Sequence, residues 1–255
     1  MEPVRLQKLL AGWGLASRRA IELWISEGRI KVDGELVQDL GRKVDPDAVR
    51  IEVDGRLVTR PGVLETEGRL VVALHKPIGV VSTLADTHGR PTVRDLLMPK
   101  ERRLFPIGRL DLDTSGLLLA TDHGELANRL LHPRFKVDKE YDVHISGGLL
   151  SEPDRKIFAN GMELDDGPTA PCKIEVTGAG RYRVILREGR KRQIRRMFSL
   201  LFRRVLQLHR VRFGPVRIGA LFPGECRTLT PREVEALFEA VGLSSDEMAR
   251  GGKSE

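Results

Sequence analysis

The order of strand-like and helix-like segments constrains the fold of this 255-residue chain more than any other feature. Apolar and alternating stretches predict strands at 70–75, 139–145, 172–177, 181–187 and 205–213. Stretches with helical periodicity lie near 92–98, 122–131, 151–159, 191–202 and 230–240. Because strands and helices do not alternate strictly, we expect an α+β fold with a mainly antiparallel mixed sheet flanked by helices.

The first 58 residues show a pattern of their own. Leucines on one face predict a short helix that ends near Gly12, and Ser17 is a suitable N-cap for a second helix. Residues 30–37 and 49–58 each alternate around an Asp-Gly pair, which is a strong signal of a β-hairpin. We therefore expect a first domain at 1–58, a polar linker at 59–68, a second domain at 69–243 and a disordered tail at 244–255.

Composition excludes several classes of protein. Two cysteines are too few for a disulfide framework or a cysteine zinc site, and the six histidines do not have the spacing of metal ligands. The sequence contains no run of 18 apolar residues, so we expect no membrane span. Its first residues lack the apolar region of a secretory signal. We expect a cytoplasmic protein that binds no metal and enters no membrane.

Positive charge is concentrated in one part of the chain. The chain has 43 Lys and Arg against 36 Asp and Glu, but residues 187–217 alone hold eleven Lys or Arg and one acid. Apolar residues recur within this part at helical spacing, which predicts a helix with a core-facing stripe and a basic outer face. That stripe consists of Ile194, Met197, Phe198, Leu201 and Phe202. A solvated surface helix is the alternative, but the dense single-sign charge favours binding to a nucleic acid.

One polar loop carries the most reactive side chains. Between Gly108 and Gly116 lie two carboxylates, a cation and two hydroxyls, followed by an apolar run. Such a loop between buried segments is a suitable place for a functional site. Asp122 with Glu125 predicts a capping box for the next helix. A paired-aspartate phosphotransferase loop is an alternative, but Thr114 stands where that loop has glycine, and no later Asp-Asp pair completes a magnesium site.

Four parts of the sequence resemble one family. Residues 108–133, GRLDLDTSGLLLATDHGELANRLLHP, are similar to the core motif of pseudouridine synthases, and most closely to the ribosomal RsuA/RluB group. Residues 139–143 and 186–197 resemble the second and third motifs of that family, in the same order. The phrases GLASRR and IKVDGELV within residues 3–50 resemble the alpha-L RNA-binding module. With HKPIGVVST from His75 onward, the resemblance extends to about residue 240.

This resemblance implies an alpha-L domain followed by a catalytic domain that converts a specific uridine to its C-glycoside isomer without a cofactor. Within the family, the chain looks most like the large-subunit RluB type. The implied partner is therefore 23S ribosomal RNA or a pre-ribosomal particle, bound by a monomer. One alternative is an enzyme for the small-subunit RNA. Another is a catalytically silent ribosome-assembly factor on the same scaffold, which the presence of Asp111, Tyr141 and Arg195 disfavours.

The resemblance also assigns roles to single residues. Asp111 would be the nucleophile or base, Tyr141 would stack on the flipped-out base, and Arg195 would pair with Asp111 to keep it ionised. The alternatives are a loop carboxylate that caps backbone amides for Asp111 and a strand filler for Tyr141. Leu186 and Ile194 would line the pocket, and Arg109 would either fill the gap left by the base or hold the loop. RNA phosphates would contact Ser17, Arg18, Arg19, Lys31, Arg190, Lys191, Arg192 and Arg196.

Overall fold

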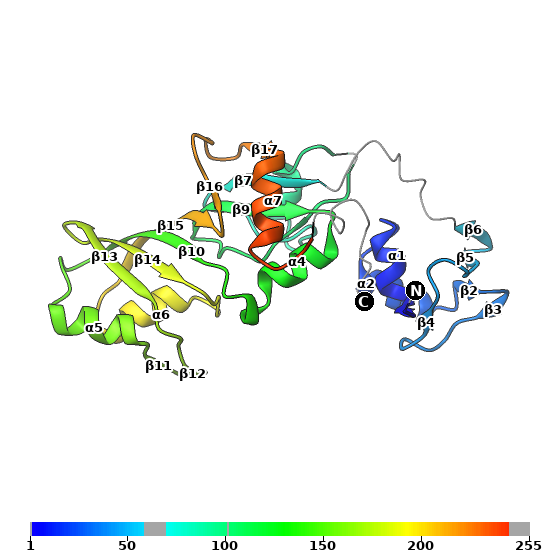
Figure 1. Ribbon diagram of the computed structural model, residues 1–255, viewed down its shortest axis with the longest axis horizontal. Helices are drawn as coiled ribbons and strands as arrows, with labels where there is room; N and C mark the ends of the chain where they lie inside the picture. Colours follow the sequence, from blue (N-terminus) through cyan, green and yellow to red (C-terminus); the bar gives the residue numbers. More distant parts are fainter. Residues whose placement is uncertain (1, 59–69, 101, 245–255) are drawn as a thin grey trace. The chain divides into compact units, whose positions relative to one another are not determined.

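The computed structural model describes residues 2–58, 70–100 and 102–244. These residues divide into two compact units, one within 2–58 and one within 70–244, each shown in Figure 1. The linker predicted at 59–68 lies outside the described residues, as does the predicted tail beyond Ser244. Within the described part, no helix is both long and apolar enough to span a bilayer.

The first unit has the predicted two helices and two hairpins. Helix α1 spans Leu6–Gly12, and α2 spans Arg18–Ser26. The Oγ of Ser17 accepts a hydrogen bond from the backbone N–H of Ala20 at 3.1 Å, which confirms the predicted N-cap. A four-stranded sheet has the order β3-β2-β5-β6, with bounds Glu35–Leu36, Ile30–Val32, Ile51–Val53 and Arg56–Val58.

The backbone of both Asp-Gly turns explains why these pairs predict hairpins. φ is +53° at Asp33 and +88° at Gly34, and it is +52° at Asp54 and +74° at Gly55. Two consecutive positive φ angles are typical of a type I′ turn, whose twist matches that of the paired strands. A further short pair joins β1 (Val4–Arg5) to β4 (Lys43–Val44). The helices and sheet together enclose a small apolar core.

The second unit is built on a nine-stranded sheet. The main path runs β13-β14-β10-β15-β9-β7-β17, with β16 beside β15 and β8 beside β9. Its strands in chain order are β7 Val71–Lys76, β8 Phe105–Pro106, β9 Ser115–Thr121, β10 Lys139–Ile145, β13 Lys173–Gly178, β14 Arg181–Leu186, β15 Val205–Phe213, β16 Val216–Arg217 and β17 Cys226–Thr228. Only β15 and β9 pair in parallel among the described strands, so the mainly antiparallel mixed sheet is confirmed.

Helices bury both faces of this sheet. They are α3 Val93–Leu96, α4 Gly124–Leu131, the 3-10 turn η1 Pro133–Phe135, α5 Glu152–Asn160, α6 Gln193–Leu200 and α7 Pro231–Glu239. Residues of β7 enter two different cores: Val71 belongs to the apolar cluster that includes residues of α4 and α7, and Leu74 to the cluster that includes residues of α5 and α6. A strand buried on both faces reads as a continuous apolar run, as β7 and β9 do.

Three details differ from the sequence-based expectation. The apolar run after Gly116 is strand β9, which the predicted strands did not include. The N-cap of α4 is His123, whose Nδ1 accepts from Leu126 N at 3.1 Å, so the predicted Asp122–Glu125 capping box is wrong. Asp122 instead accepts from Leu70 N at 3.0 Å and pairs with Arg102. Phe202 does not join the core stripe, because α6 ends at Leu200 and its ring is 92% exposed.

A small acidic hairpin stands beside the basic segment. Strands β11 (Glu163–Leu164) and β12 (Gly167–Pro168) pair around Asp165 and Asp166. The two aspartates at the turn contact arginines from the part of the chain that precedes and begins α6.

Candidate active site

The polar loop predicted to carry the chemistry lies between β8 and β9. It ends at Gly116, where β9 meets β15 in the parallel pairing of Gly116 with Arg210. A Cβ at Gly116 would lie 2.3 Å from the backbone oxygen of Arg210, and φ is +112° there. Only glycine fits both the close approach and the backbone conformation. The end of the loop is therefore set by the contact between two strands.

Three residues from two segments, the one that follows β7 and helix α6, hold the backbone on both sides of Asp111. The Oγ of Ser82 donates to Leu110 O at 2.8 Å and accepts from Leu110 N at 3.1 Å. The N–H of Gly79 donates to Leu112 O at 2.9 Å. The guanidinium of Arg195 donates to Asp113 O at 2.8 Å. The position of Asp111 is thus determined by its neighbours rather than by contacts of its own side chain.

Asp111 is half-buried, and no polar group of the described protein binds its carboxylate. Among the described residues, it makes no hydrogen bond or ion pair, so it caps no backbone amide there. Its negative charge nevertheless acts on Lys76, Arg192 and Arg195. The carboxylate therefore lies in the field of three cations, and none of them binds its oxygens in the described structure.

Lys76 is a cation of this site to which the sequence reasoning gave no role. It ends β7 with an exposed fraction of 0%, and its Nζ donates to Pro77 O at 2.8 Å and Val80 O at 2.9 Å. Burial lowers the pKa of Lys76 to about 8, against the opposing charges of Asp111 and Asp113. In the sequence, the signal for such a role is a lysine at the end of a mostly apolar strand. Packing of that strand buries the amine, and a buried amine needs polar partners.

Arg195 has a different carboxylate partner from the predicted one. Its Nη2 lies 3.3 Å from an oxygen of Asp113, and its Nη1 donates to Val205 O at 3.2 Å. No contact joins it to Asp111 in the described structure, so the predicted pair of Arg195 with Asp111 is not formed there, although the charge of Asp111 acts on Arg195. The Arg195 guanidinium donates hydrogen bonds to two backbone carbonyls, Val205 O and Asp113 O, which fix its orientation at the loop. Burial lowers the pKa of Arg195, although the charge of Asp113 opposes this shift.

Asp113 is the acidic centre of the arginine contacts. Arg192 makes a two-point contact with it, at 3.0 and 3.1 Å. Burial would raise the pKa of Asp113, but the hydrogen bonds from Arg192 and the charge of Arg195 outweigh burial and lower it. This geometry suits a residue that supports the loop. The supporting contacts come from residues about 80 positions away in the chain.

The predicted pocket residues lie in the hydrophobic core beside this loop. Tyr141, Leu186 and Ile194 have exposed fractions of 9%, 3% and 3%, and they share one apolar cluster with Leu110. Tyr141 lies on β10 between β14 and β15, and its hydroxyl has no hydrogen-bond partner among the described residues. Arg109 is exposed, and no described residue pairs with its side chain. Tyr141, Leu186 and Ile194 therefore lie in one cluster, whereas Arg109 faces solvent.

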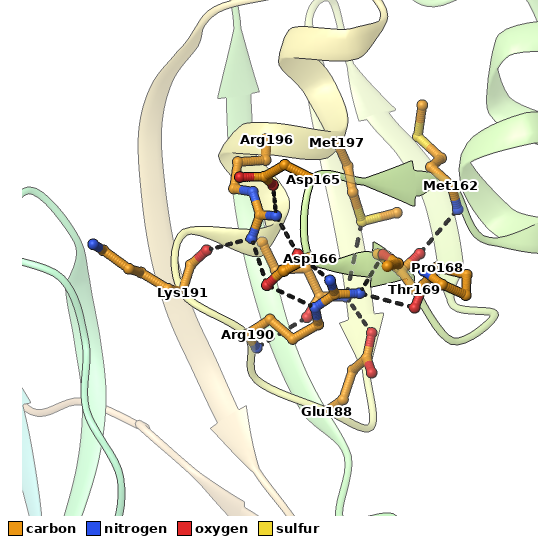
Figure 2. Close-up of polar contacts among 12 residues, drawn as sticks. Met162, Asp165, Asp166, Pro168, Thr169, Glu188, Arg190, Lys191, Arg196 and Met197 are labelled. Carbon is orange, nitrogen blue, oxygen red and sulfur yellow. Dashed lines mark hydrogen bonds and ion pairs between the residues drawn. The ribbon is translucent and has the colours of Figure 1, made fainter.

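Aspartates hold most of the cations predicted to contact RNA near α6. Figure 2 shows Arg190 and Arg196 facing Asp165 and Asp166, with ion pairs between them. Arg190 also donates to Gly167 O and Pro168 O, each at 2.8 Å. Hydrogen bonds from Arg196 and Arg190 lower the pKa of Asp166. With Arg192 held by Asp113, Lys191 is the exposed member of the four whose side chain has no contact in the described structure.

The cations of the first unit that are predicted to contact RNA have no such ion pairs, although Arg29 and Arg50 of the same unit do. Arg18, Arg19 and Lys31 are exposed, and none of them has a side-chain partner among the described residues. Ser17 uses its hydroxyl as the N-cap of α2. These residues come from α2 and β2, which share the apolar core of the unit. Their charges are therefore available to a ligand without the loss of an ion pair.

No metal-binding cluster is present in the described part of the chain, since no three His, Cys, Asp or Glu side chains group closely enough. Asp111 and Asp113 lie among cations instead. A phosphotransferase loop would need metal ligands around the two acids. The arrangement suits an isolated carboxylate that acts on a bound ligand.

Comparison with known proteins identifies this arrangement. The sequence model described as RNA pseudouridylate synthase matches residues 70–200, which include Lys76, Asp111, Tyr141 and Arg195. The chain belongs to the RNA pseudouridine synthase family. The model described as S4 domain matches residues 4–49, which form the first unit.

Similar proteins extend over nearly the whole chain. An uncharacterized RNA pseudouridine synthase of Mycobacterium leprae is 42% identical, covering 94% of each chain. The ribosomal large subunit pseudouridine synthase B of Bacillus subtilis is 41% identical, covering 91% of this chain and 95% of its own. A crystal structure of a pseudouridylate synthase is 31% identical with a TM-score of 0.67, covering 92% of this chain and 99% of its own. The family membership and the two-part architecture expected from the sequence are thereby confirmed.

Proposed function

We propose that this RNA pseudouridine synthase isomerises one specific uridine of large-subunit ribosomal RNA, with Asp111 as its nucleophile or base. The half-buried Asp111 carboxylate, which has no direct protein partner in the described structure, carries the proposal. Relatives named ribosomal large subunit pseudouridine synthase B support the substrate. We place the enzyme in the cytoplasm as a monomer, since assembling ribosomal subunits are its proposed partner.

During the reaction the uracil detaches from its ribose and attaches to it again through a different atom. The N1–C1′ bond of uridine breaks, the uracil turns over, and C5 bonds to C1′ while C5 loses its proton and N1 gains one. The reaction is redox-neutral, so no cofactor enters its balance. Asp111 would supply the lone pair, at C1′, at C6 or on the 2′ proton. Lys76 and Arg195 would keep it ionised when the uridine excludes water.

The target base must leave its stack to reach Asp111. In this proposal it lies against Tyr141, with Leu186 and Ile194 at its edges and Arg109 on the outer side. Stacking of a base on an aromatic ring contributes about 1–3 kcal/mol. The apolar cluster around Tyr141 supports this role, because a rigid, dry floor favours a planar base.

RNA recruitment falls mainly to the first unit. Its exposed cations Arg18, Arg19 and Lys31 have no internal partner among the described residues, and phosphate contacts require such groups. Ser17, at the start of α2, would contribute the adjacent backbone amides to the same phosphates. Lys191 would add a contact from the catalytic unit.

Tritium release from C5-labelled RNA tests the proposal. The wild type should release tritium from large-subunit RNA, and Asp111→Asn should release none while binding the RNA as tightly as the wild type. Asp113→Asn is the matched control, and it should lower the rate without abolishing it. Binding without release by the wild type, on free RNA and on partly assembled subunits, would instead indicate a silent assembly factor. Release only from small-subunit RNA would reassign the substrate.

A further inference from the structure

The end of helix α6 has an unusual residue at a position that favours glycine. Phe202 N donates to Ser199 O at 3.0 Å, and Arg203 N donates to Phe198 O at 2.9 Å. These two bonds form a Schellman motif, in which the residue after the helix adopts a left-handed backbone. That residue is Phe202, with φ at +56°. A bulky side chain is disfavoured in this conformation, because its Cβ crowds the backbone.

The side chain of Phe202 has no compensating burial. Its exposed fraction is 92%, the highest among the large hydrophobic residues of the described chain. An exposed aromatic ring gains nothing from the hydrophobic effect. Neither the backbone nor the ring therefore favours phenylalanine at this position for stability. A residue that strains the backbone without gaining stability from its side chain is typical of a functional site.

Two neighbouring arginines have no acidic partner among the described residues. They are the half-buried Arg203 and the exposed Arg204, and the only hydrogen bond that either side chain makes there is a weak one at 3.4 Å from Arg203 to Phe202 O. This differs from the start of α6, where Arg190, Arg192 and Arg196 are all paired with aspartates. The turn after α6 therefore combines an exposed aromatic ring with two uncompensated positive charges.

The turn is anchored to Ser146, the residue after β10, and Arg195 links the chain after the turn to the proposed catalytic loop. Ser146 N donates to Arg204 O at 2.9 Å, and Arg204 N donates to Ser146 Oγ at 3.2 Å. Val205 O accepts from Nη1 of Arg195, whose Nη2 contacts Asp113 O. One guanidinium thus spans from the backbone after the turn to the backbone beside Asp111. A nucleotide next to one bound at Asp111 would be within reach of the turn.

We propose that Phe202, Arg203 and Arg204 bind an unpaired nucleotide of the RNA substrate next to the target uridine. The base would stack on the ring of Phe202, and the two guanidiniums would contact its phosphates. Aromatic stacking next to arginines is a common way to bind single-stranded RNA. A protein partner fits less well, since two uncompensated cations flank the ring. The inference rests on the proposed function, because it requires an RNA substrate.

Substitution of Phe202 by glycine separates binding from stability. Phe202→Gly should raise the melting temperature by about 2–4 °C, since glycine adopts the left-handed backbone without strain. The same variant should weaken binding to large-subunit ribosomal RNA by about 5- to 150-fold. Its affinity for a fully paired RNA duplex should equal that of the wild type. Phe202→Trp should keep wild-type affinity for the ribosomal RNA, because it retains a stacking surface.

Ile157→Ala is the matched control, since Ile157 is a half-exposed apolar residue on α5 that is not part of the turn, and its loss should leave RNA affinity unchanged. An unchanged affinity of Phe202→Gly, with an active wild type, would overturn the inference and leave the proposed function intact. An equal loss in Phe202→Trp would overturn it as well, because the ring would not be the cause. A wild type that neither binds nor modifies RNA would overturn both proposals.

Discussion

In the first unit, Lys8, Arg18, Arg19 and Lys31 are exposed and have no acidic partner among the described residues. In the second unit, the denser cluster of arginines around the start of α6 is paired with Asp113, Asp165 and Asp166. The sequence suggests the reverse ranking, since residues 187–217 hold eleven cations and one acid. Charge density along the chain is therefore a poor measure of the charge that RNA can reach.

The difference separates two uses of arginine. An unpaired, exposed arginine can replace a counterion on a phosphate, and its contribution falls with salt. An arginine held by a carboxylate and two carbonyls is instead a rigid structural cation. Arg195 is of the second kind, with contacts to Asp113 and Val205. The first unit would thus supply affinity, and the paired arginines would supply geometry at the active site.

The largest effect is expected at Arg195, where a structural arginine should affect turnover far more than RNA affinity. Arg195→Ala should lower turnover by about 10²- to 10³-fold, as loss of a preorganised electrostatic contact does in other enzymes. RNA affinity should change by less than about threefold. Single-turnover rates and filter binding on the same RNA measure the two quantities. Equal losses in both would mean that Arg195 binds phosphate after all.

A second test concerns the buried cation Lys76. Because its pKa is lowered to about 8, the ammonium is present below that pH and is lost above it. If its charge supports Asp111, kcat/KM should decline about tenfold per pH unit above pH 8. Lys76→Met should show a low rate without this decline.

Lys139 provides the control for that profile. Burial also lowers its pKa to about 8, but its charged neighbours are Arg210, Asp138 and Glu188 rather than Asp111. Lys139→Met should therefore keep the decline of the wild type. If the decline disappears in Lys139→Met and persists in Lys76→Met, the assignment to Lys76 is wrong.

The smallest expected effect tests the two kinds of arginine directly. Arg18→Ala with Arg19→Ala should reduce the slope of log affinity against log salt by about 1.4–1.8, as two lost phosphate contacts require. Arg190→Gln with Arg196→Gln should leave that slope within about 0.5 of the wild type. Measurements of RNA affinity between about 50 and 200 mM salt give the slopes of both double variants. A larger change in the second variant would show that RNA displaces Asp165 and Asp166.

Much of the local structure could be predicted from short stretches of sequence. The two Asp-Gly hairpins, the Ser17 cap and the main strands of the catalytic unit follow from turn chemistry and periodicity, which act over a few residues. The family was recognised separately, from the resemblance of several motifs in their order along the chain. The capping box at Asp122 failed because the helix begins one residue later, with His123 as its N-cap, while Leu70 N and Arg102 bind the Asp122 carboxylate.

Only the tertiary structure decided which charges meet and which side chains are buried. The pairing of Arg192 and Arg195 with Asp113 joins residues 79 and 82 positions apart, through loops that the sheet brings together. The burial of Lys76 depends on the elements packed around β7, and the exposure of Phe202 depends on where α6 ends. Periodicity describes one element at a time, whereas desolvation and ion pairing depend on every element that surrounds a group.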